Sequence, residues 1–395
     1  MNLSLDEEQR EFQEEAIAWM ESHAPREPLP PPCDKDGFDA HCQWEKELAA
    51  AGYTGIDWPV QFGGRGRDLE ALLIFEEVYW QFDPPERVNV NGLGFVGPAI
   101  LMFGDEEQKQ SWLPRIVTCD DIWCQGFSES DAGSDLGSIR TSAMPKGNDF
   151  ILRGHKMWST YGPFGDWLLV LARTDTNARA SAGMSMLAVD MKDPSVDVRP
   201  IRQISGESEF AEVFLNDVEV PRSNVIGRVN DGWRVAMRTL EFERGTALGS
   251  PARLHRDLRH LRTLIDATGR AADDAIKEQF GTLYADVETF RYAIYRSISE
   301  LSRGRDLGAH SSVNKILYSE VSARVFELGL SLMGHFADLD GSAPLVRDTF
   351  GPEVERIWTS WHRRYWLARA STIASGTNEI QRNVIARGLL RLPNR

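Results

Sequence analysis

The spacing of apolar residues changes twice along this chain of 395 residues, and that change constrains the fold more than any other feature of the sequence. Helical spacing runs to about residue 118, short β-rich runs fill residues 119–230, and helical spacing returns in residues 231–395. Helices followed by strands and then by helices indicate separate modules, because an α/β wind would alternate the two. We therefore predict a mainly α protein with an N-terminal helical domain (1–118), a middle β-domain (119–230) and a C-terminal helical bundle (231–395).

The first segment opens with a helix start signal. Ser4 with Glu7 three residues later fits a capping box, and apolar residues follow at helical spacing as far as Met20. Prolines then break the helical pattern at residues 28–32. Further helical patterns lie at residues 44–51, 69–80 and 96–103.

The two later segments carry different signals. Short runs typical of strands lie at residues 167–172, 184–189 and 213–220, and a turn signal lies at residues 146–149. In the last segment, residues 282–303 contain neither Gly nor Pro, so they predict a long helix. Long helices joined by short links favour an antiparallel bundle.

Composition narrows the class of protein. A formal net charge of −15 disfavours nucleic acid or an anionic membrane as the main partner, because both need clustered Lys and Arg. No apolar run reaches the roughly 18 residues of a membrane span, and the acidic N-terminus does not fit a signal peptide. We expect a cytoplasmic protein whose four cysteines are reduced and mostly structural. A zinc site at His41 and Cys42 is the minor alternative, and we predict no metal.

Residues 92–97, Gly-Leu-Gly-Phe-Val-Gly, satisfy the dinucleotide-binding pattern Gly-x-Gly-x-x-Gly. Their context differs from that of a nucleotide site, since they lie within a helical segment, Pro98 follows at once, and no βαβ unit surrounds them. We interpret these glycines as a chance match or as positions where helices pack closely.

A polar stretch at the start of the β-domain is more informative. Residues 125–135, Gln-Gly-Phe-Ser-Glu-Ser-Asp-Ala-Gly-Ser-Asp, combine hydroxyls with a Gly-Ser turn that can expose backbone N–H groups. Such groups suit a polar ring edge or a phosphate. From composition alone, a solvated surface turn fits the same residues.

This stretch resembles the flavin-binding signature of the acyl-CoA dehydrogenases, a Thr/Ser-Glu-x-x-Ala-Gly-Ser-Asp pattern. Residues 154–160, Gly-His-Lys-Met-Trp-Ser-Thr, are similar to the Gly-x-Lys-x-Trp-Ile-Thr strand of the same family. Three further matches occur in the family's order, at residues 104–109, 218–227 and 375–382. Five collinear matches that span nearly the whole chain are far more specific than any one of them.

The resemblance implies a barrel-like middle domain, a C-terminal four-helix bundle and FAD held between them. It also implies nine cofactor-binding residues. These are Gln125 at the start of the motif; Phe127, Ser128, Trp158 and Thr160 at the isoalloxazine; Gly133 and Ser134 on the pyrophosphate or substrate side; and Thr377 and Glu379 at the ribityl-phosphate and adenosine. Without the neighbouring motifs, Trp158 would be interpreted as an ordinary core tryptophan.

The catalytic base is expected at Glu243. Dehydrogenation needs a carboxylate beside the thioester α-carbon, and burial raises the pKa of such a group toward the operating range. Many family members carry this Glu directly before the C-terminal Gly-Thr, where this chain has the neutral Ser375. Others carry it on the first bundle helix before an Arg, and Glu243 precedes Arg244 in this way. Glu241 would lie about 200° around the helix. The alternative is that Glu243 is a paired surface charge.

One family feature is missing. Homotetrameric members carry an Arg-x-x-Phe-Gly segment followed by Gln, and residues 262–281 lack it, while only Leu332-Met333-Gly334 stands near the place of a Gln-x-x-Gly-Gly segment. This combination resembles actinobacterial members that form α2β2 assemblies on bulky, often steroid-derived, CoA thioesters. The chain is therefore expected to form a homo-oligomer such as a tetramer, or a hetero-oligomer with a second dehydrogenase-like chain.

The leading functional hypothesis is FAD-dependent oxidation of an acyl-CoA to the trans-2-enoyl-CoA, with electrons passing to an electron-transfer flavoprotein or a similar acceptor. An acyl-CoA oxidase or a nitroalkane-type oxidase on the same fold is one alternative, which oxygen consumption would reveal. A non-catalytic partner subunit is another, and the acidic residue at position 243 argues against it.

Overall fold

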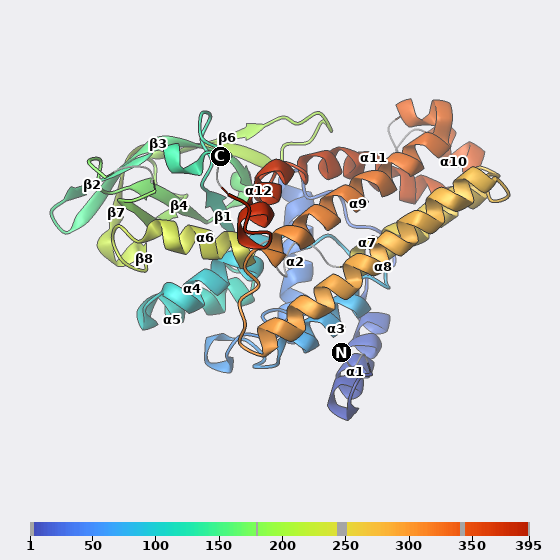
Figure 1. Ribbon diagram of the computed structural model, residues 1–395, viewed down its shortest axis with the longest axis horizontal. Coiled ribbons are helices and arrows are strands. Elements are labelled where there is room, and N and C mark those ends of the chain that lie inside the picture. The colour runs from blue at the N-terminus through green and yellow to red at the C-terminus, as the bar shows by residue number, and fades with distance from the viewer. Residues whose placement is uncertain (1–3, 179–180, 243–250, 340–343, 394–395) are drawn as a thin grey trace. The chain divides into compact units, whose positions relative to one another are not determined.

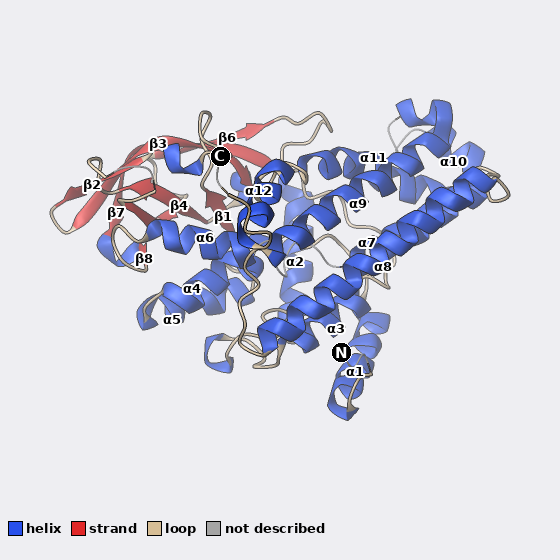
Figure 2. Cartoon of the chain, viewed as in Figure 1, coloured by secondary structure: helices blue, strands red, loops and turns tan. Residues whose placement is uncertain are grey.

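The computed structural model describes residues 4–178, 181–242, 251–339 and 344–393, which Figures 1 and 2 show as ribbons. It contains two compact units. The sheet unit comprises His23–Leu72 and Pro84–Glu243, and the bundle unit comprises Met1–Ser22, Leu73–Asp83 and Arg244–Arg395. The predicted mainly α fold with a β-rich middle is confirmed, and the two boundaries between the three domains stay a prediction.

The first part of the sheet unit is helical, and its helices include the residues with predicted helical patterns. They are α2 (Lys35–Ala50), α4 (Gly97–Phe103) and α5 (Glu106–Val117), while α3 (Leu69–Tyr79) starts here and continues into the bundle unit. The dinucleotide-like glycines form a π-helical turn (Gly92–Val96) that runs into α4. A Cβ atom on Gly97 would lie 2.0 Å from the ring of Trp58. Close packing against the loop residue Trp58 is therefore the reason for this glycine, and the neighbour is not another helix as one interpretation held.

One mixed sheet fills the rest of the unit, with the strand order β6-β7-β3-β2-β4-β5-β8 and with β1 paired to β4. The predicted strands and the turn at 146–149 are confirmed, since Lys146 pairs with Asp149 across a hairpin. The strands are β1 (Trp123–Gly126), β2 (Ser142–Lys146), β3 (Asp149–Thr160), β4 (Trp167–Arg173), β5 (Met184–Asp190), β6 (Val196–Ile201), β7 (Phe210–Pro221) and β8 (Val225–Ile226).

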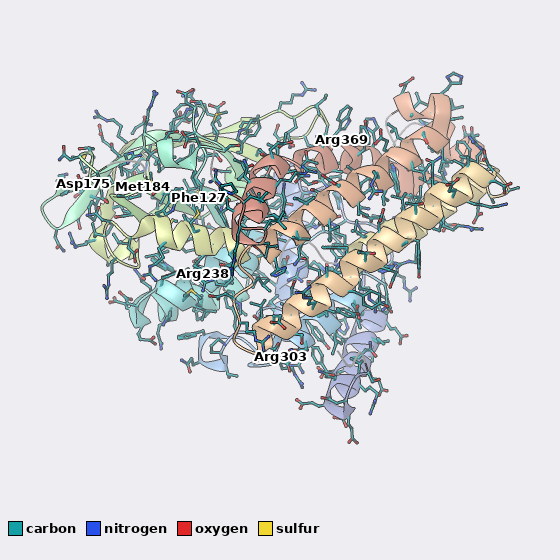
Figure 3. All side chains as sticks on the ribbon, viewed as in Figure 1. Phe127, Asp175, Met184, Arg238, Arg303 and Arg369 are labelled. Carbon is teal, nitrogen blue, oxygen red and sulfur yellow. The ribbon has the colours of Figure 1, made fainter. Side chains whose placement is uncertain are left out.

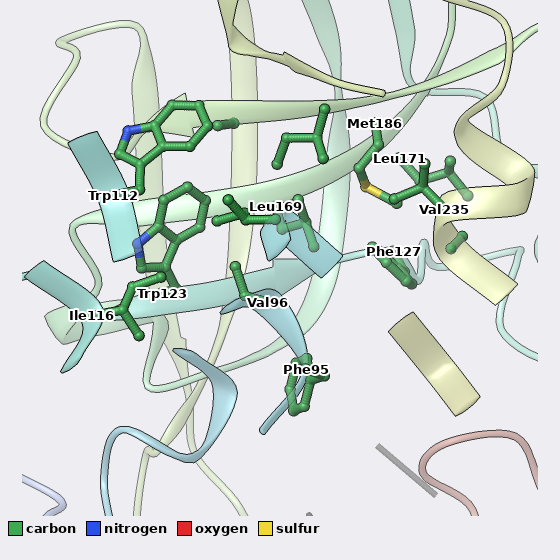
Figure 4. Close-up of a cluster of buried hydrophobic side chains, with 14 of the residues drawn as sticks. Phe95, Val96, Trp112, Ile116, Trp123, Phe127, Leu169, Leu171, Met186 and Val235 are labelled. Atoms are coloured by element: carbon green, nitrogen blue, oxygen red, sulfur yellow. The ribbon is translucent and has the colours of Figure 1, made fainter. Parts of the chain in front are cut away.

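The sheet is buried on both faces at β4 and β5. Leu169 and Leu171 of β4 belong to one apolar cluster, and the alternating Leu168 and Val170 belong to another. Burial on both faces explains why β4 reads as a continuous apolar run and not as an alternating one. Figure 4 shows the first cluster, which helix α6 (Gly232–Phe242) enters through Val235.

The bundle unit is helical, as predicted. Its helices are α1 (Glu7–His23), α7 (Pro251–Ala267), α8 (Asp274–Ser302), α9 (His310–Met333), α10 (Pro344–Phe350), α11 (Pro352–Ala370) and α12 (Asn378–Gly388). Helix α9 is central, because α7, α8, α11 and α12 all pack against it. In the part of the chain that the structure describes, no helix combines the length and the apolar character needed to cross a membrane.

The start of α1 differs from the prediction. The capping box is formed by Asp6 and Gln9, because Asp6 Oδ1 accepts from Gln9 N at 2.9 Å and Gln9 Oε1 accepts from Asp6 N at 3.2 Å. Ser4 and Glu7 fit the same pattern in sequence, but Glu7 is already the first helical residue. The capping residue must directly precede the helix, so the assignment of Ser4 was wrong by two positions.

Candidate functional site

Strand β1 and the loop after it carry the first group of predicted site residues. Phe127 is buried in the cluster of Figure 4, and Figure 3 labels it in the sheet unit. Gln125 and Ser128 are half-buried. The side-chain Nε2 of Gln125 is itself buried and has no hydrogen-bond partner within the described residues. A buried donor of this kind is costly unless a ligand or water accepts from it.

Strand β3 carries Trp158 and Thr160 and has a register shift between Lys156 and Ser159. In a regular strand, residues three apart face opposite sides, but the bulge leaves Lys156 and Ser159 both buried. Trp158 takes the extra position, with φ of 64° and a side chain that is 54% exposed. Trp158 is therefore not a core tryptophan, and a left-handed conformation is uncommon for such a bulky residue.

The bulged part of β3 holds the β1 loop by its carbonyl groups. Ser159 Oγ donates to the carbonyl of Gln125 at 3.0 Å. Lys156 Nζ donates to the carbonyl of Phe127 at 3.0 Å, and Met157 N donates to the carbonyl of Ser128 at 2.9 Å. Three carbonyls within four residues are thus turned toward β3.

Gly133 and Ser134 lie on the exposed loop that continues from this point. The loop is closed by a two-residue bridge, in which Glu129 and Ala132 exchange backbone hydrogen bonds of 3.1 Å each. A Cβ atom on Gly133 would find no atom within 4 Å, so the space beside this residue is open. The structure brings seven predicted residues together on β1, β3 and this loop, all in the sheet unit.

These residues fit the flavin that the family resemblance implies. A planar ring system needs an exposed aromatic surface and polar groups at its edge, and Trp158 supplies the first. Gln125 Nε2 is a buried donor that lacks an acceptor in the described chain, and the open space at Gly133 leaves room for a ligand. The fit rests on these features of the sheet unit alone.

Thr377 and Glu379 lie in the bundle unit at the start of α12. Thr377 is the N-cap of this helix, and its side chain accepts from Ile380 N at 3.3 Å. Backbone hydrogen bonding and the Thr377 hydroxyl hold the pKa of Glu379 below its usual range. The preceding turn is held by Gln381, whose Nε2 donates to the carbonyl of Ser375 at 2.8 Å.

Glu243, the predicted base, lies outside the described residues. Its neighbour Glu241 is described, and its carboxylate accepts from Arg238 at 2.6 Å. Glu241 is thus held in an ion pair on its own helix, three residues from its partner. The role of Glu243 stays a prediction.

Sequence analysis missed a buried ion pair beside the predicted loop. Lys156 is fully buried, and its Nζ lies 2.8 Å from Glu129 Oε1. Burial lowers the pKa of Lys156 to about 8, against the opposing effect of the Glu129 charge. A signal was present, because Lys156 follows Phe150 and Leu152 on the inward phase of a strand, where a lysine needs a partner.

A polar hollow in the bundle unit was also not foreseen. Arg291 Nε lies 3.2 Å from Glu77, and His255 Nε2 lies 2.9 Å from Glu288. Burial lowers the pKa of His255, so Arg291 is the cation of these two groups, and its pairing with Glu77 leaves it little uncompensated charge for a phosphate or a carboxylate.

Comparison with known proteins points to the family that the motifs resemble, along nearly the whole chain. Family profiles match in order: acyl-CoA dehydrogenase N-terminal domain at residues 6–120, middle domain at 124–218 and C-terminal domain at 230–390. A protein called acyl-CoA dehydrogenase IpdE1 from Mycolicibacterium smegmatis is 35% identical over 371 residues, covering 91% of this chain and 90% of that protein. Its namesake from Mycobacterium tuberculosis is 36% identical over 361 residues, with the same coverage.

Solved structures agree on the fold. The ChsE4-ChsE5 complex from Mycobacterium tuberculosis contains a chain that is 26% identical, with a TM-score of 0.81 and full coverage of both chains. The Tcur3481-Tcur3483 steroid ACAD contains one that is 22% identical, with a TM-score of 0.85 and full coverage of both chains.

Proposed function

The chain belongs to the acyl-CoA dehydrogenase family, and from this premise we propose that it uses FAD to oxidise an acyl-CoA thioester to the trans-2-enoyl-CoA. The observation that carries the proposal is the match of all three domain profiles, in order, to one chain. The same matches support domain boundaries near residues 118 and 230. They support dehydrogenation as the reaction and leave the acyl group open.

We propose that the flavin binds where β1 and the bulge of β3 meet. FAD bound there would supply the acceptor for the hydride that leaves the β-carbon. Trp158 would cover the ring, Gln125 would donate from its buried Nε2, and Ser128 would bond the polar edge. Phe127 would form the apolar floor, because it is buried in the core beneath the loop.

The remaining cofactor contacts are proposed from the family pattern. Thr160 would reach the ring near N5, and Gly133 and Ser134 would face the pyrophosphate or the substrate. Thr377 and Glu379, at the start of α12, would contact the ribityl-phosphate and adenosine portion.

We propose Glu243 as the base that takes the α-proton. Support comes from its place directly before Arg244 and from the neutral Ser375 at the other position that family members use. The pairing of Glu241 with Arg238 also favours Glu243, because the nearby alternative carboxylate is already engaged. A carboxylate in this role needs a pKa raised by burial beside the acyl chain.

We further propose that the chain works with a second dehydrogenase-like chain and passes electrons to an electron-transfer flavoprotein or a similar acceptor. In residues 262–281, Lys277 precedes Phe280-Gly281 where the Arg-x-x-Phe-Gly segment has Arg, and this departure supports an incomplete self-paired site. Similarity to a chain of the ChsE4-ChsE5 complex supports a hetero-oligomer. Bulky, steroid-derived thioesters belong in the substrate panel for this reason.

The test is a single-turnover reaction. Wild type, Glu243→Gln and the matched control Glu241→Gln are purified with and without candidate partner chains, and loss of the flavin's visible absorption is followed after mixing with acyl-CoA thioesters. We expect rapid bleaching in wild type and Glu241→Gln, and a loss of about 100-fold or more in Glu243→Gln, the usual contribution of a general base.

Three results would contradict the proposal. Equal bleaching rates in wild type and Glu243→Gln would move the base to another residue. Oxygen consumption without an added electron carrier would indicate an oxidase. A wild-type chain that takes up no FAD, even with partner chains, would remove the basis for the reaction itself.

A further inference from the structure

The buried lysine of β3 contacts the predicted flavin loop directly. Lys156 is 0% exposed, and its Nζ donates to the carbonyl of Phe127 at 3.0 Å and to Glu129 Oε1 at 2.8 Å. An ammonium group has three donors and no acceptor, so one lysine can serve a carbonyl and a carboxylate at once. The carbonyl belongs to the residue directly before Ser128, the predicted contact of the flavin's polar edge.

The carboxylate on the other side of this lysine is fully engaged by the protein. Glu129 Oε2 accepts from Arg140 N at 2.7 Å, and Glu129 Oε1 accepts from Thr141 N at 2.9 Å as well as from Lys156. Although burial alone would raise the pKa of Glu129, the charge of Lys156 and these hydrogen bonds hold it below its usual range. Lys156 and Glu129 thus tie the loop to β3 and to the segment before β2.

This arrangement fixes the direction of one peptide group. In a planar trans peptide the N–H points away from the C=O. The carbonyl of Phe127 points to Lys156, so the N–H of Ser128 must point away from the buried lysine. The carbonyl of Ser128 is turned toward β3 by Met157 N, which fixes the next peptide in the same way.

Stability alone does not explain a buried charge at this place. Replacing a buried ion pair with apolar residues of similar size is often neutral or stabilising, because two desolvated charges recover little net energy. An apolar side chain at position 156 would fill the same space without holding the Phe127 carbonyl. The lysine therefore supplies orientation that an apolar residue would lack.

We propose that Lys156, paired with Glu129, is a positioning residue that sets the Phe127–Ser128 peptide so that the N–H of Ser128 and its side chain face the polar edge of the bound isoalloxazine. This inference rests on the proposed function, because it assigns the flavin edge to Ser128. Lys156 itself touches neither flavin nor substrate and acts through the loop.

The matched control is a second buried pair in the same unit. Arg87 Nε lies 2.9 Å from both oxygens of Glu45, and Glu45 Oε1 also accepts from Val88 N at 3.0 Å. The paired variants are Lys156→Met with Glu129→Gln, and Arg87→Met with Glu45→Gln. Removing both charges together avoids a lone buried charge, so each double variant is expected to fold.

The first measurement is amide hydrogen exchange on the chain without flavin. We expect residues 126–132 to exchange at least about tenfold faster in Lys156→Met/Glu129→Gln, because the loop loses hydrogen bonds to charged groups. The Arg87→Met/Glu45→Gln variant should leave these amides at wild-type rates. Unchanged exchange in the first variant, or equal acceleration in both, would overturn the positioning role.

The second measurement is FAD titration of the apo-protein, with its partner chain if wild type requires one, followed by the visible spectrum of the bound flavin. We expect Lys156→Met/Glu129→Gln to bind FAD about tenfold more weakly with an altered band shape, and the control to stay within about twofold of wild type. Faster exchange with unchanged affinity and spectrum would overturn the link to the flavin. If wild type binds no FAD, the proposed function fails and this inference fails with it.

Discussion

Two carboxylates in the sheet unit, the buried Glu45 and the largely buried Glu129, are built to the same plan, but only Glu129 borders a predicted cofactor-binding residue. Each accepts from two consecutive backbone N–H groups, and each pairs with a cation that is buried or largely buried. The cation differs, being Arg87 in one pair and Lys156 in the other.

The difference between the cations explains the difference in what they connect. The planar guanidinium of Arg87 contacts both oxygens of Glu45, a bidentate geometry that joins two segments firmly. The ammonium of Lys156 divides its donors between a carboxylate and the Phe127 carbonyl. The arginine pair thus fastens helix α2 to a loop, whereas the lysine pair orients a peptide that a ligand can use.

Removing the cation from either pair should give the largest effect on the free energy of unfolding. We expect Arg87→Met and Lys156→Met each to lower the free energy of unfolding by about 3–5 kcal/mol, because each leaves a buried carboxylate without its cation. Urea unfolding followed by circular dichroism measures this. The two double variants, which remove both charges, should recover at least half of the loss. A loss below about 1 kcal/mol in either single variant would show that its carboxylate finds water or another donor, and the two pairs would no longer be equivalent.

These pairs also show which features of the structure could be predicted from the sequence. The helices and strands followed from periodicity, because alternation and helical spacing reflect burial directly. The ion pair of Lys156 with Glu129 could not be predicted in this way. The two residues lie 27 positions apart and meet only through the pairing of β1 and β3 with the rest of the sheet. A lysine within an apolar strand signalled a partner without naming it.

The bulge in β3 was equally hidden from the sequence. Strand β3 contains Gly154, but neither Gly nor Pro stands between Lys156 and Ser159 to mark the register shift there, and the φ of Trp158 is 64°. The capping box shows a smaller failure of the same kind, because two Ser/Asp-to-Glu/Gln spacings overlap and only the helix start decides between Ser4 and Asp6. Motif resemblance predicted the site residues, but it said nothing about what holds them.

Changing the pH should separate the two cations with an effect of intermediate size. Burial lowers the pKa of Lys156 from 10.5 to about 8, so between these values the unfolded chain holds a proton that the folded chain has lost. Stability from this group therefore rises with pH across the window, and between pH 8 and pH 10 the rise is about 2 kcal/mol, since one pKa unit corresponds to about 1.4 kcal/mol and the group is only partly titrated near either pKa. An arginine has no titration in this range.

The measurement is the difference in unfolding free energy between wild type and each single variant at pH 8 and at pH 10. We expect the difference to grow by about 2 kcal/mol for Lys156→Met and to stay constant for Arg87→Met. Parallel changes in both variants would assign the pH dependence to other groups and would remove lysine titration as a distinction between the two pairs.

The smallest effect on stability should come from removing one of two buried hydroxyls. These neutral groups allow the same comparison as the two ion pairs. Ser159 Oγ donates to the carbonyl of Gln125 at 3.0 Å, and Thr54 Oγ1 donates to the carbonyl of Val117 at 2.9 Å. Ser159→Ala and Thr54→Val should each lower the free energy of unfolding by about 1 kcal/mol, because each removes one buried neutral hydrogen bond. Only Ser159→Ala should weaken FAD binding, by about two- to threefold, since of these two bonds only this one holds the strand that carries Gln125. Urea unfolding and FAD titration on the same samples give both values.

Equal FAD affinity in the two variants would confine the positioning of the loop to Lys156. Weaker binding in Thr54→Val would mean that general loss of stability, and not loop orientation, controls the flavin site.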